Sequence, residues 1–410
     1  MTGPVEERSQ QILAAYLEEH EAGLTALRRQ LHMRPEIGGH EVATTHAIEQ
    51  RLQAVGLSPS RLAVGTGLVC DLGDADAGGP LVALRADIDA LALVDDKLVP
   101  YRSQIGGVAH ACGHDVHTAA VVGAGEALAR ILAESDVPGR VRLIFEPREE
   151  SARPGALDII EEGWLDGVQA IFGVHCDPKL DVGRIGCRVG AITSAADMVE
   201  IHVSGPGGHT ARPHLTVDLV GVLGRIITGL PTALDERTGS ARVLSMVFGA
   251  VHSGEASNVI PARGVLRGTL RTPDREAWAL APQLLEQAVA EVLSGTGATW
   301  EIDHQRGVPP VVNDPAATEL LAASSRLALG ELAVSPTEHS MGGDSFAWYL
   351  EHVPGSYGRL GVHDPTSTAP RLDLHAGSFD VDERAIGNGV RVLTTTAVSA
   401  LLRLATTGAL

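Results

Sequence analysis

The sequence predicts an α/β protein in which a mixed, twisted sheet flanked by helices is interrupted by a smaller α+β domain. Strand-like and helix-like stretches alternate up to about residue 190, and the alternation resumes beyond about residue 305. Between these points the elements follow a βαββαβ-like order. With 410 residues, the chain exceeds the size at which one core keeps growing. We therefore expect a first domain of residues 1–189 and 306–410, with residues 190–305 inserted as a second.

The composition indicates a soluble, acidic protein. Hydrophobic residues make up 44% of the chain, and 51 acidic against 32 basic residues give a net charge of −19. This charge argues against nucleic acid or an anionic membrane surface as a partner. Because the N-terminus carries no apolar segment and no apolar run reaches about eighteen residues, we expect a cytoplasmic location. Four cysteines are too few for a disulfide scaffold, so a cysteine beside histidines is better explained as a metal ligand.

The first quarter of the chain supplies outer helices and the first strands. The predicted elements are helices over residues 7–33 and 40–55 and strands over residues 68–72 and 81–85. The last of these strands leads into Asp87 and Asp89, whose side chains share one side at the end of a strand. Open α/β sheets place their chemistry at strand ends, although a capped turn explains this pair about equally well.

A dense cluster of metal-ligand side chains follows, just before an apolar helical run. Eight residues contain three histidines, a cysteine and an aspartate, namely His110, Cys112, His114, Asp115 and His117. Imidazole and thiolate suit zinc and its neighbours, and Cys112 and His114 share one side of an extended segment. Asp115 is placed to accept the second ring N–H of a ligating histidine, and His117 is expected to face away. A helix N-terminus capped by Asp115 is the alternative interpretation.

The spacing favours a catalytic metal site over a structural one. Structural zinc sites close with four nearby nitrogen or sulfur ligands, and the sequence has no second cysteine pair near Cys112. The next predicted elements are a helix over residues 116–135, a strand over 140–145, a helix over 156–163 and a strand over 170–174. The two strands are followed by Glu149-Glu150 and by His175. Although paired glutamates alone are ordinary in a solvated turn, these side chains would gather with the cluster along one edge of the sheet.

The inserted domain begins with an alternating strand and a glycine-rich loop that exposes His209 and His214. Its predicted elements are a strand over residues 197–204, a helix over 216–234, strands over 243–251 and 264–271, and a helix over 273–293. The glycine spacing in the loop does not match a nucleotide-binding fingerprint. Beyond the insertion we expect a helix over 314–329, a turn over 340–344, a helix over 345–352, a strand over 356–362 and a helix over 382–406.

Short motifs are spread along nearly the whole chain. In order, they are Leu31-His32-x2-Pro35-Glu36, Arg85-Ala86-Asp87-Ile88-Asp89-Ala90-Leu91, His110-Ala111-Cys112-Gly113-His114-Asp115-x-His117, Phe145-x-Pro147-x-Glu149-Glu150, Gly173-x-His175, Gly207-Gly208-His209-x3-Pro213-His214, Asn258-Val259-Ile260-Pro261, Gly268-Thr269-x-Arg271 and Leu374-His375. Together they resemble the M20 family of metallopeptidases and amidohydrolases, in particular its branch with aminoacylases, hippurate hydrolases and auxin-conjugate hydrolases.

The resemblance implies a metal-dependent amidohydrolase with two clustered divalent ions and Glu149 as general base. The implied metal ligands are Cys112, His114, Glu150, His175 and His375. Zinc or manganese is expected, and cobalt or nickel also suits such ligands. The expected substrates are N-acyl amino acids or related small amide conjugates. A dipeptidase or carboxypeptidase of the same family is the first alternative, and a catalytically weak metal-binding homologue is the second.

The resemblance further implies that the insertion is a ferredoxin-like lid that mediates homodimerisation. From it, His209 would reach the active site of the partner subunit, and Asn258 and Arg271 would contact the substrate. Around the metal ligands, Asp87, Asp89 and Asp115 are expected as supporting carboxylates.

The chain departs from the family pattern beside the base and in a later turn. The family usually has Gln at position 146 and Ala at position 148, where Glu146 and Arg148 stand here. Arg148 either lowers the pKa of Glu149 or points away from it. The turn usually reads Gly-Glu-Asp-Phe, whereas here Asp344 and Ser345 precede Phe346. These changes leave the implied ligands intact and bear on substrate choice.

Overall fold

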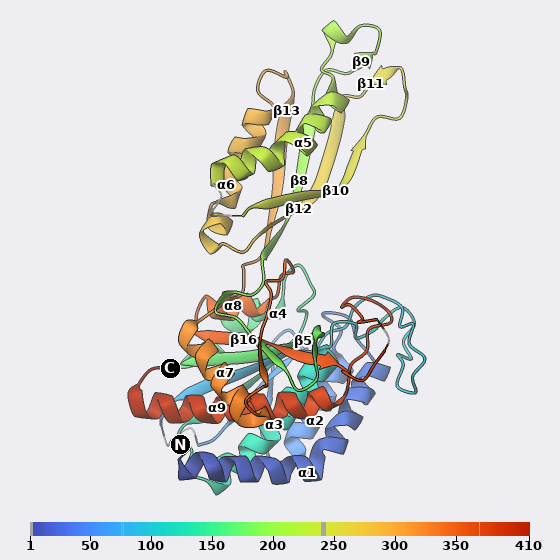
Figure 1. Cartoon of the computed structure of the whole chain (residues 1–410). Helices are drawn as coiled ribbons and strands as arrows, with labels where there is room; N and C mark the ends of the chain where they lie inside the picture. Colours follow the sequence, from blue (N-terminus) through green and yellow to red (C-terminus); the bar gives the residue numbers. More distant parts are fainter. Residues whose placement is uncertain (1–2, 75, 77, 239–242, 369) are drawn as a thin grey trace. The chain divides into compact units, whose positions relative to one another are not determined.

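The computed structural model describes residues 3–74, 76, 78–238, 243–368 and 370–410 (Figure 1). The chain divides into two compact units. The first comprises Met1–Gly190, Val312–Glu338 and Trp348–Leu410, and the second comprises Ala191–Val311 and His339–Ala347. Relative to the expected boundaries, the second unit extends to Val311 and also takes up the turn 339–347.

An eight-stranded sheet forms the centre of the first unit. In the order across the sheet, its strands are β1 (Ser60–Arg61), β2 (Leu68–Leu72), β4 (Arg140–Glu146), β3 (Leu81–Asp87), β5 (Ala170–Asp181), β16 (Gly355–His363), β6 (Ile185–Cys187) and β15 (Val334–Pro336). β4, β3, β5 and β16 run parallel, whereas β2 is antiparallel to β4 and β6 is antiparallel to β16. The short strand β14 (Val312–Asn313) also belongs to this unit. The prediction of a mixed sheet is confirmed.

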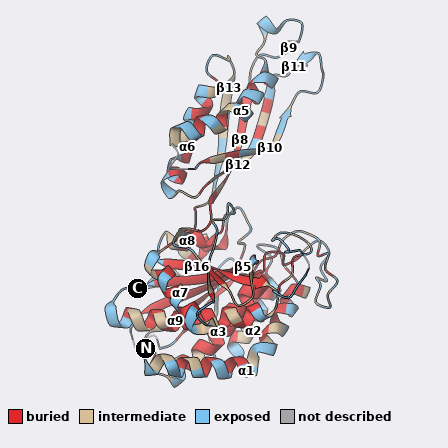
Figure 2. Cartoon of the chain, in the orientation of Figure 1, coloured by how far each residue is buried: buried red, intermediate tan, exposed pale blue. Residues whose placement is uncertain are grey.

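Helices pack on this sheet or on one another and build the core with it. They are α1 (Pro4–Met33), α2 (Val42–Ala54), α3 (His114–Glu134), α4 (Gly155–Glu161), α7 (Pro315–Leu329) and α9 (Arg384–Thr407). α3 and α9 pack against β3 and against each other, and α1 packs on both of them. Figure 2 shows the sheet strands and much of α3 as buried. α3 and α9 are long and apolar enough to cross a membrane, but 78% of each apolar window is buried inside the protein, as in core helices.

The second unit is an α+β fold. Its elements are β8 (Ala195–Ser204), β9 (Gly208–His209), the 3-10 helix Pro213–Leu215, α5 (Leu219–Thr238), β10 (Ser245–Ser253), β11 (Val259–Ile260), β12 (Arg263–Thr272), α6 (Arg275–Val292) and β13 (Thr299–Val308). The antiparallel sheet order β10-β12-β8-β13 is that of a ferredoxin-like βαββαβ fold, as expected. Alternate residues of β8, including Val199, Ile201 and Val203, pack in one core with α5 and α6. β7 (Gly190–Ala191) and α8 (Phe346–Leu350) lie where the chain passes between the units.

Hydrophobic pattern does not reveal every strand. β13 is an edge strand with no fully buried position, so its polar and charged residues hide the apolar alternation on which a prediction depends. The two-residue strands β1, β7, β9, β11 and β14 are too short to carry any pattern.

Candidate metal centre

The candidate site lies where parallel strands of the first unit end. β3 ends at Asp87, which pairs in register with Glu146 at the end of β4. Arg85 holds both carboxylates, because its Nη1 donates to Asp87 Oδ2 at 2.6 Å and its Nε donates to Glu146 Oε2 at 2.7 Å. In β5, on the other side of β3, Gly173 pairs with Arg85, which brings His175 level with Asp87. Polar side chains of three neighbouring strands therefore meet at one edge of the sheet.

The cysteine and histidine cluster enters this edge through a left-handed glycine. Gly113 has φ +86°, and a Cβ atom there would lie 2.7 Å from the Sγ atom of Cys176. Any other residue would combine backbone strain with a clash. α3 begins at His114, so Gly113 turns the chain between Cys112 and His114, and the expected extended segment ends at this turn.

His114 presents one ring nitrogen to a carboxylate and leaves the other available. Its Nδ1 lies 3.2 Å from Asp89 Oδ1 and 3.8 Å from Asp87 Oδ1. Its Nε2 is buried without a hydrogen-bond partner among the described residues. Although burial by itself lowers the pKa of His114, the negative charge of Asp87 and the hydrogen bond with Asp89 contribute to raising it well above its ordinary value. A ring held by a carboxylate at Nδ1, in surroundings that attract a cation, suits metal ligation through Nε2.

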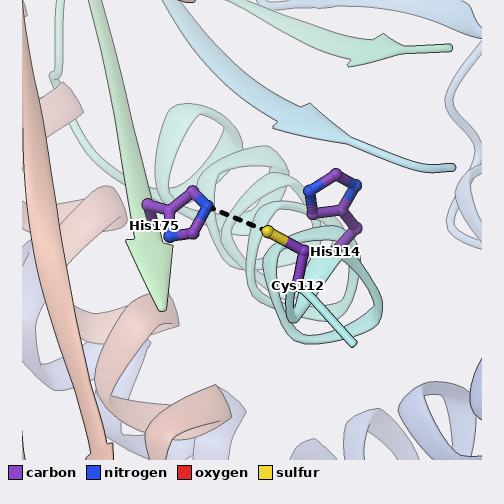
Figure 3. A group of neighbouring side chains, drawn as sticks. All are labelled: Cys112, His114 and His175. Atoms are coloured by element: carbon purple, nitrogen blue, oxygen red, sulfur yellow. Dashed lines mark hydrogen bonds between the residues drawn. The ribbon is translucent and has the colours of Figure 1, made fainter. Parts of the chain in front are cut away.

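Cys112 and His175 complete a buried group with His114 (Figure 3). The Sγ atom of Cys112 lies 3.4 Å from His175 Nε2. The Nδ1 atom of His175 lies 2.7 Å from the carbonyl oxygen of Cys176, which fixes the proton on Nδ1 and directs the Nε2 lone pair toward the sulfur. Burial lowers the pKa of His175 well below its ordinary value, so the ring is neutral, as ligation requires. Burial raises the pKa of the Cys112 thiol, and a bound cation would reverse this effect.

Glu150 and His375 extend the cluster. The Oε1 atom of Glu150 lies 3.1 Å from His375 Nε2 and 3.9 Å from His114 Nε2. Burial raises the pKa of Glu150, but its hydrogen bond with His375 and the positive charges of His114 and His375 together lower it below the ordinary value. The same hydrogen bond raises the pKa of His375. Glu149 approaches His114 and Glu150, so the general base predicted from the resemblance lies beside two of the predicted ligands.

Two residues of this site have strained backbones. Arg148 and His375, both with φ +59°, are the non-glycine residues with positive φ in the described part of the chain. Such a conformation costs on the order of 1–3 kcal/mol and persists only where the surroundings impose it. The N–H of Arg148 donates to Glu41 Oε1 at 2.7 Å, and the N–H of His375 donates to the carbonyl of Ala111 at 2.8 Å. Strain thus occurs immediately before Glu149 and at His375 itself.

The donor atoms fit divalent transition metals. Cys112, His114 and His175 form one group whose ligand atoms lie within 4.8 Å of one another, and Cys112, Glu150 and His375 form a second. Because the two groups share Cys112, all five residues predicted as ligands belong to one connected cluster. Thiolate, imidazole and carboxylate in such a cluster suit zinc or its neighbours.

A further group of Asp87, His114 and His117 is explained without a metal. His117 Nδ1 lies 2.6 Å from Asp87 Oδ1, and its Nε2 accepts the N–H of Cys176 at 2.8 Å. Both ring nitrogens are therefore used within the protein, and His117 ties α3 to β3 and β5.

We expect His117→Gln to keep its metal and to lose stability, whereas His114→Gln should lose metal. Disrupting buried hydrogen bonds of His117 should lower the free energy of unfolding by about 1–3 kcal/mol. Elemental analysis and urea titration of both variants check this expectation. Equal loss of metal in the two variants would contradict the different roles.

The carboxylate that supports the predicted ligand His114 is Asp89, not Asp115. Asp89 Oδ1 faces His114, and Asp89 Oδ2 accepts the N–H of Glu150 at 3.0 Å. Asp115 follows His114 in the first turn of α3 and accepts hydrogen bonds from Arg28 and His32 instead. Successive residues of a helix point about 100° apart, so the neighbour of a ligand need not face the ion.

Arg28 contacts Asp115 and Glu41 contacts the backbone of Arg148, and no sequence motif predicts either contact. Arg28 alone leaves a sequence signal, because it lies at helical spacing beside Leu24, Leu27 and Leu31 on the buried face of α1.

Arg148 and Glu146, which replace the residues usual in the family, each have polar partners nearby in the structure. The Arg148 guanidinium pairs with Asp158, so the alternative in which it points away from Glu149 matches its contacts. Glu146 is buried and accepts hydrogen bonds from Arg85, from the Tyr349 hydroxyl at 2.9 Å and from the N–H of Ala156 at 2.8 Å.

Asp344 is also buried, and its Oδ1 accepts the N–H of Phe346 at 2.9 Å, at the start of α8. The Asp344 carboxylate therefore holds the turn that leads into α8.

The remaining candidates lie in the second unit. His209 is exposed on β9 and pairs in register with Val259 of β11, and its Nδ1 accepts the N–H of Ala211 at 3.0 Å. The carbonyl of Asn258 accepts the N–H of Thr210, which places Asn258 beside His209. Arg271, on β12, donates from Nη1 to the carbonyl of Met341 at 2.6 Å.

Comparison with known proteins identifies the family. The sequence model of peptidase family M20/M25/M40 matches residues 83–399. The chain belongs to this family. A Bacillus subtilis protein named N-acetyl-L-cysteine deacetylase is 35% identical over 368 residues, which cover 89% of this chain and 85% of that protein. The resemblance drawn from the motifs is therefore confirmed.

A longer relative and a solved structure add to this assignment. A Rhodococcus jostii protein provisionally named glutamate–cysteine ligase is 43% identical over 373 residues, which cover 91% of this chain but 46% of the relative. The chain thus spans less than half of the length of that relative. A Bacillus subtilis crystal structure, described as a dinuclear metal-binding peptidase of family M20, is 32% identical with a TM-score of 0.81, covering 94% of this chain and 99% of that one.

Proposed function

We propose that this M20 protein is a metal-dependent amidohydrolase that cleaves the amide bond of N-acyl amino acids or related small amide conjugates. The observation that carries the proposal is the connected cluster of donor atoms, in which Glu149 lies beside the ligands. The M20 relative named N-acetyl-L-cysteine deacetylase supports an N-acyl amino acid as the substrate. The relative described as dinuclear supports two divalent ions per chain, for which we propose zinc or manganese.

The proposed ligands are Cys112, His114, Glu150, His175 and His375. Divalent ions held there would polarise the amide carbonyl and lower the pKa of water toward neutrality from about 15.7. Glu149 takes the proton of the attacking water and returns it to the leaving nitrogen. Asp89 orients the proposed ligands His114 and Glu150, because its carboxylate holds both the His114 ring and the backbone of Glu150.

The second unit is proposed as a lid that mediates a homodimer and supplies His209 to the partner's site. Because Nδ1 of His209 accepts a hydrogen bond, the neutral ring carries its proton on Nε2 and can donate it to an oxyanion. A single such donor contributes roughly 3–4 kcal/mol. Arg271 is proposed to bind the carboxylate of the amino acid, since its bond to Met341 uses one of five N–H donors, and Asn258 to contact the substrate beside it.

A cytoplasmic location is part of the proposal. Cys70, Cys112, Cys176 and Cys187 are all free, which suits a reducing compartment.

A substrate panel on metal-reconstituted protein tests the function. We expect the metal-depleted protein to be inactive and zinc or manganese to restore hydrolysis of N-acetyl and N-benzoyl amino acids, with dipeptides cleaved more slowly. Preference for dipeptides would favour the dipeptidase alternative. A protein that binds two ions and cleaves none of these compounds would favour the non-catalytic homologue.

A further inference from the structure

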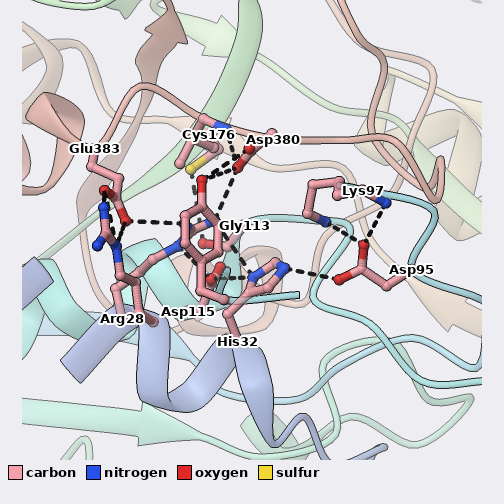
Figure 4. Close-up of polar contacts among 12 residues, drawn as sticks. Arg28, His32, Asp95, Lys97, Gly113, Asp115, Cys176, Asp380 and Glu383 are labelled. Carbon is pink, nitrogen blue, oxygen red and sulfur yellow. Dashed lines mark hydrogen bonds and ion pairs between the residues drawn. The ribbon is translucent and has the colours of Figure 1, made fainter. Parts of the chain in front are cut away.

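A buried arginine on α1 contacts Asp115, the residue that follows the proposed ligand His114 (Figure 4). Arg28 is 1% exposed, and its Nε donates to Asp115 Oδ2 at 2.7 Å. The same oxygen lies 2.7 Å from Nδ1 of His32, one turn further along α1. Burial by itself lowers the pKa of Arg28, but the charges of Asp115 and Asp380 raise it above its ordinary value. Since a buried charge is costly unless paired, the position of Arg28 depends on these carboxylates.

Arg28 joins two segments that carry proposed metal ligands. On one side, Asp115 follows His114 in the first turn of α3. On the other side, Nη1 donates to Glu383 Oε1 at 3.2 Å and Nη2 lies 3.5 Å from Asp380 Oδ1, in the segment that follows His375. One guanidinium therefore spans carboxylates from both segments.

Neighbouring contacts reinforce this junction. The Tyr101 hydroxyl donates to Asp380 Oδ2 at 3.0 Å, and the Arg28 guanidinium carbon lies 4.8 Å from the centre of the Tyr101 ring. The N–H of His375 also donates to the carbonyl of Ala111 at 2.8 Å, so the two segments touch directly next to Cys112. A shift of either segment would change the separation between ligand atoms on both.

We propose that Arg28 is a positioning residue for the metal centre, keeping the segment with Cys112 and His114 and the segment with His375 at metal-binding distance. This inference rests on the metal centre proposed above. Ligands that are held in place before the ion arrives lose less freedom on binding. Groups that orient ligands from outside typically change metal affinity by about 10–100-fold.

The competing explanation is that Arg28 serves only the packing of α1 on α3 and α9. Arg51 provides a matched control, since its Nε donates at 2.6 Å to Glu126 of α3, a carboxylate that is 3% exposed. This pair also joins two helices through a buried charge, but Glu126 lies about three turns along α3 from His114.

The test compares Zn²⁺ and Mn²⁺ affinities of full-length, metal-depleted variants by competition with a chromophoric chelator. Arg28→Met is expected to weaken affinity by about 10–100-fold. Arg28→Lys should fall between it and wild type, because an ammonium keeps the charge but cannot span three carboxylates. Arg51→Met should stay within about twofold of wild type even where urea titration shows lower stability. Should Arg28→Met not fold, Glu383→Gln replaces it. This variant removes the charge of one of the two carboxylates after His375 that Arg28 contacts, and also that of the pair with the exposed Arg29. It should weaken affinity by about tenfold.

The proposal would be overturned if Arg28→Met bound the metal within about twofold of the wild-type affinity. If Arg28→Met does not fold, an affinity of Glu383→Gln within about twofold of wild type would overturn it instead. An equal loss in Arg51→Met would also overturn it, because general stability would then set the affinity. A wild-type chain that binds neither ion would instead overturn the metal centre, so the two failures are distinguishable.

Discussion

Glu149→Gln is expected to keep its metal and to lose about 10²–10⁴-fold in kcat, the range typical of a general base. The amide matches the carboxylate in size but cannot accept the proton of the attacking water. KM should change little, because the base acts on the proton that is transferred in the transition state and does not bind the substrate. Steady-state kinetics and elemental analysis of the same preparation measure both quantities.

Glu150→Gln is the matched control for this variant, since it alters the adjacent residue in the same way. Glu150 contacts His375 and approaches His114, so its amide variant should lose metal as well as turnover. Near-normal kcat in Glu149→Gln would place the base at another residue. Loss of metal in both variants to the same degree would show that the two glutamates share one role.

Mixing His209→Ala chains with Glu149→Gln chains is expected to restore activity that neither variant has alone. If His209 serves the partner's site, a heterodimer has one complete site, formed by Glu149 of the His209→Ala chain and His209 of its partner. At equal amounts, half of the dimers are heterodimers with one complete site of two, so activity should approach about a quarter of wild type. His209→Ala alone should lose about 10²–10³-fold in kcat.

Subunit exchange must be verified with differently tagged chains before this result is interpreted. Confirmed exchange without recovery of activity would mean that His209 acts within its own chain or has no catalytic role. A monomeric protein with full activity would contradict the dimeric arrangement.

The closeness of the predicted ligand side chains can be anticipated from the sequence because short-range spacing and strand ends are local features. Cys112 and His114 flank one residue, and His175 and Glu150 lie in or just after apolar runs that form β5 and β4. Parallel strands bring such ends together in any sheet of this kind. The pairing of His375 with them follows from the family resemblance alone.

Which carboxylate supports which side chain cannot be read from spacing. Asp115 lies next to His114 in sequence, yet the turn at Gly113 and the start of α3 direct it toward Arg28, and Asp89 takes its place. The backbones of Arg148 and His375 also escape prediction, because tertiary contacts impose a conformation that residue type disfavours.

Anomalous diffraction above the zinc edge, from crystals of the zinc-reconstituted protein, tests the metal centre most directly. Two anomalous peaks per chain are expected, each within about 2.0–2.3 Å of donor atoms from Cys112, His114, Glu150, His175 and His375. Zinc bound at other residues, or no peak at this cluster in a protein that holds zinc, would contradict the proposed centre.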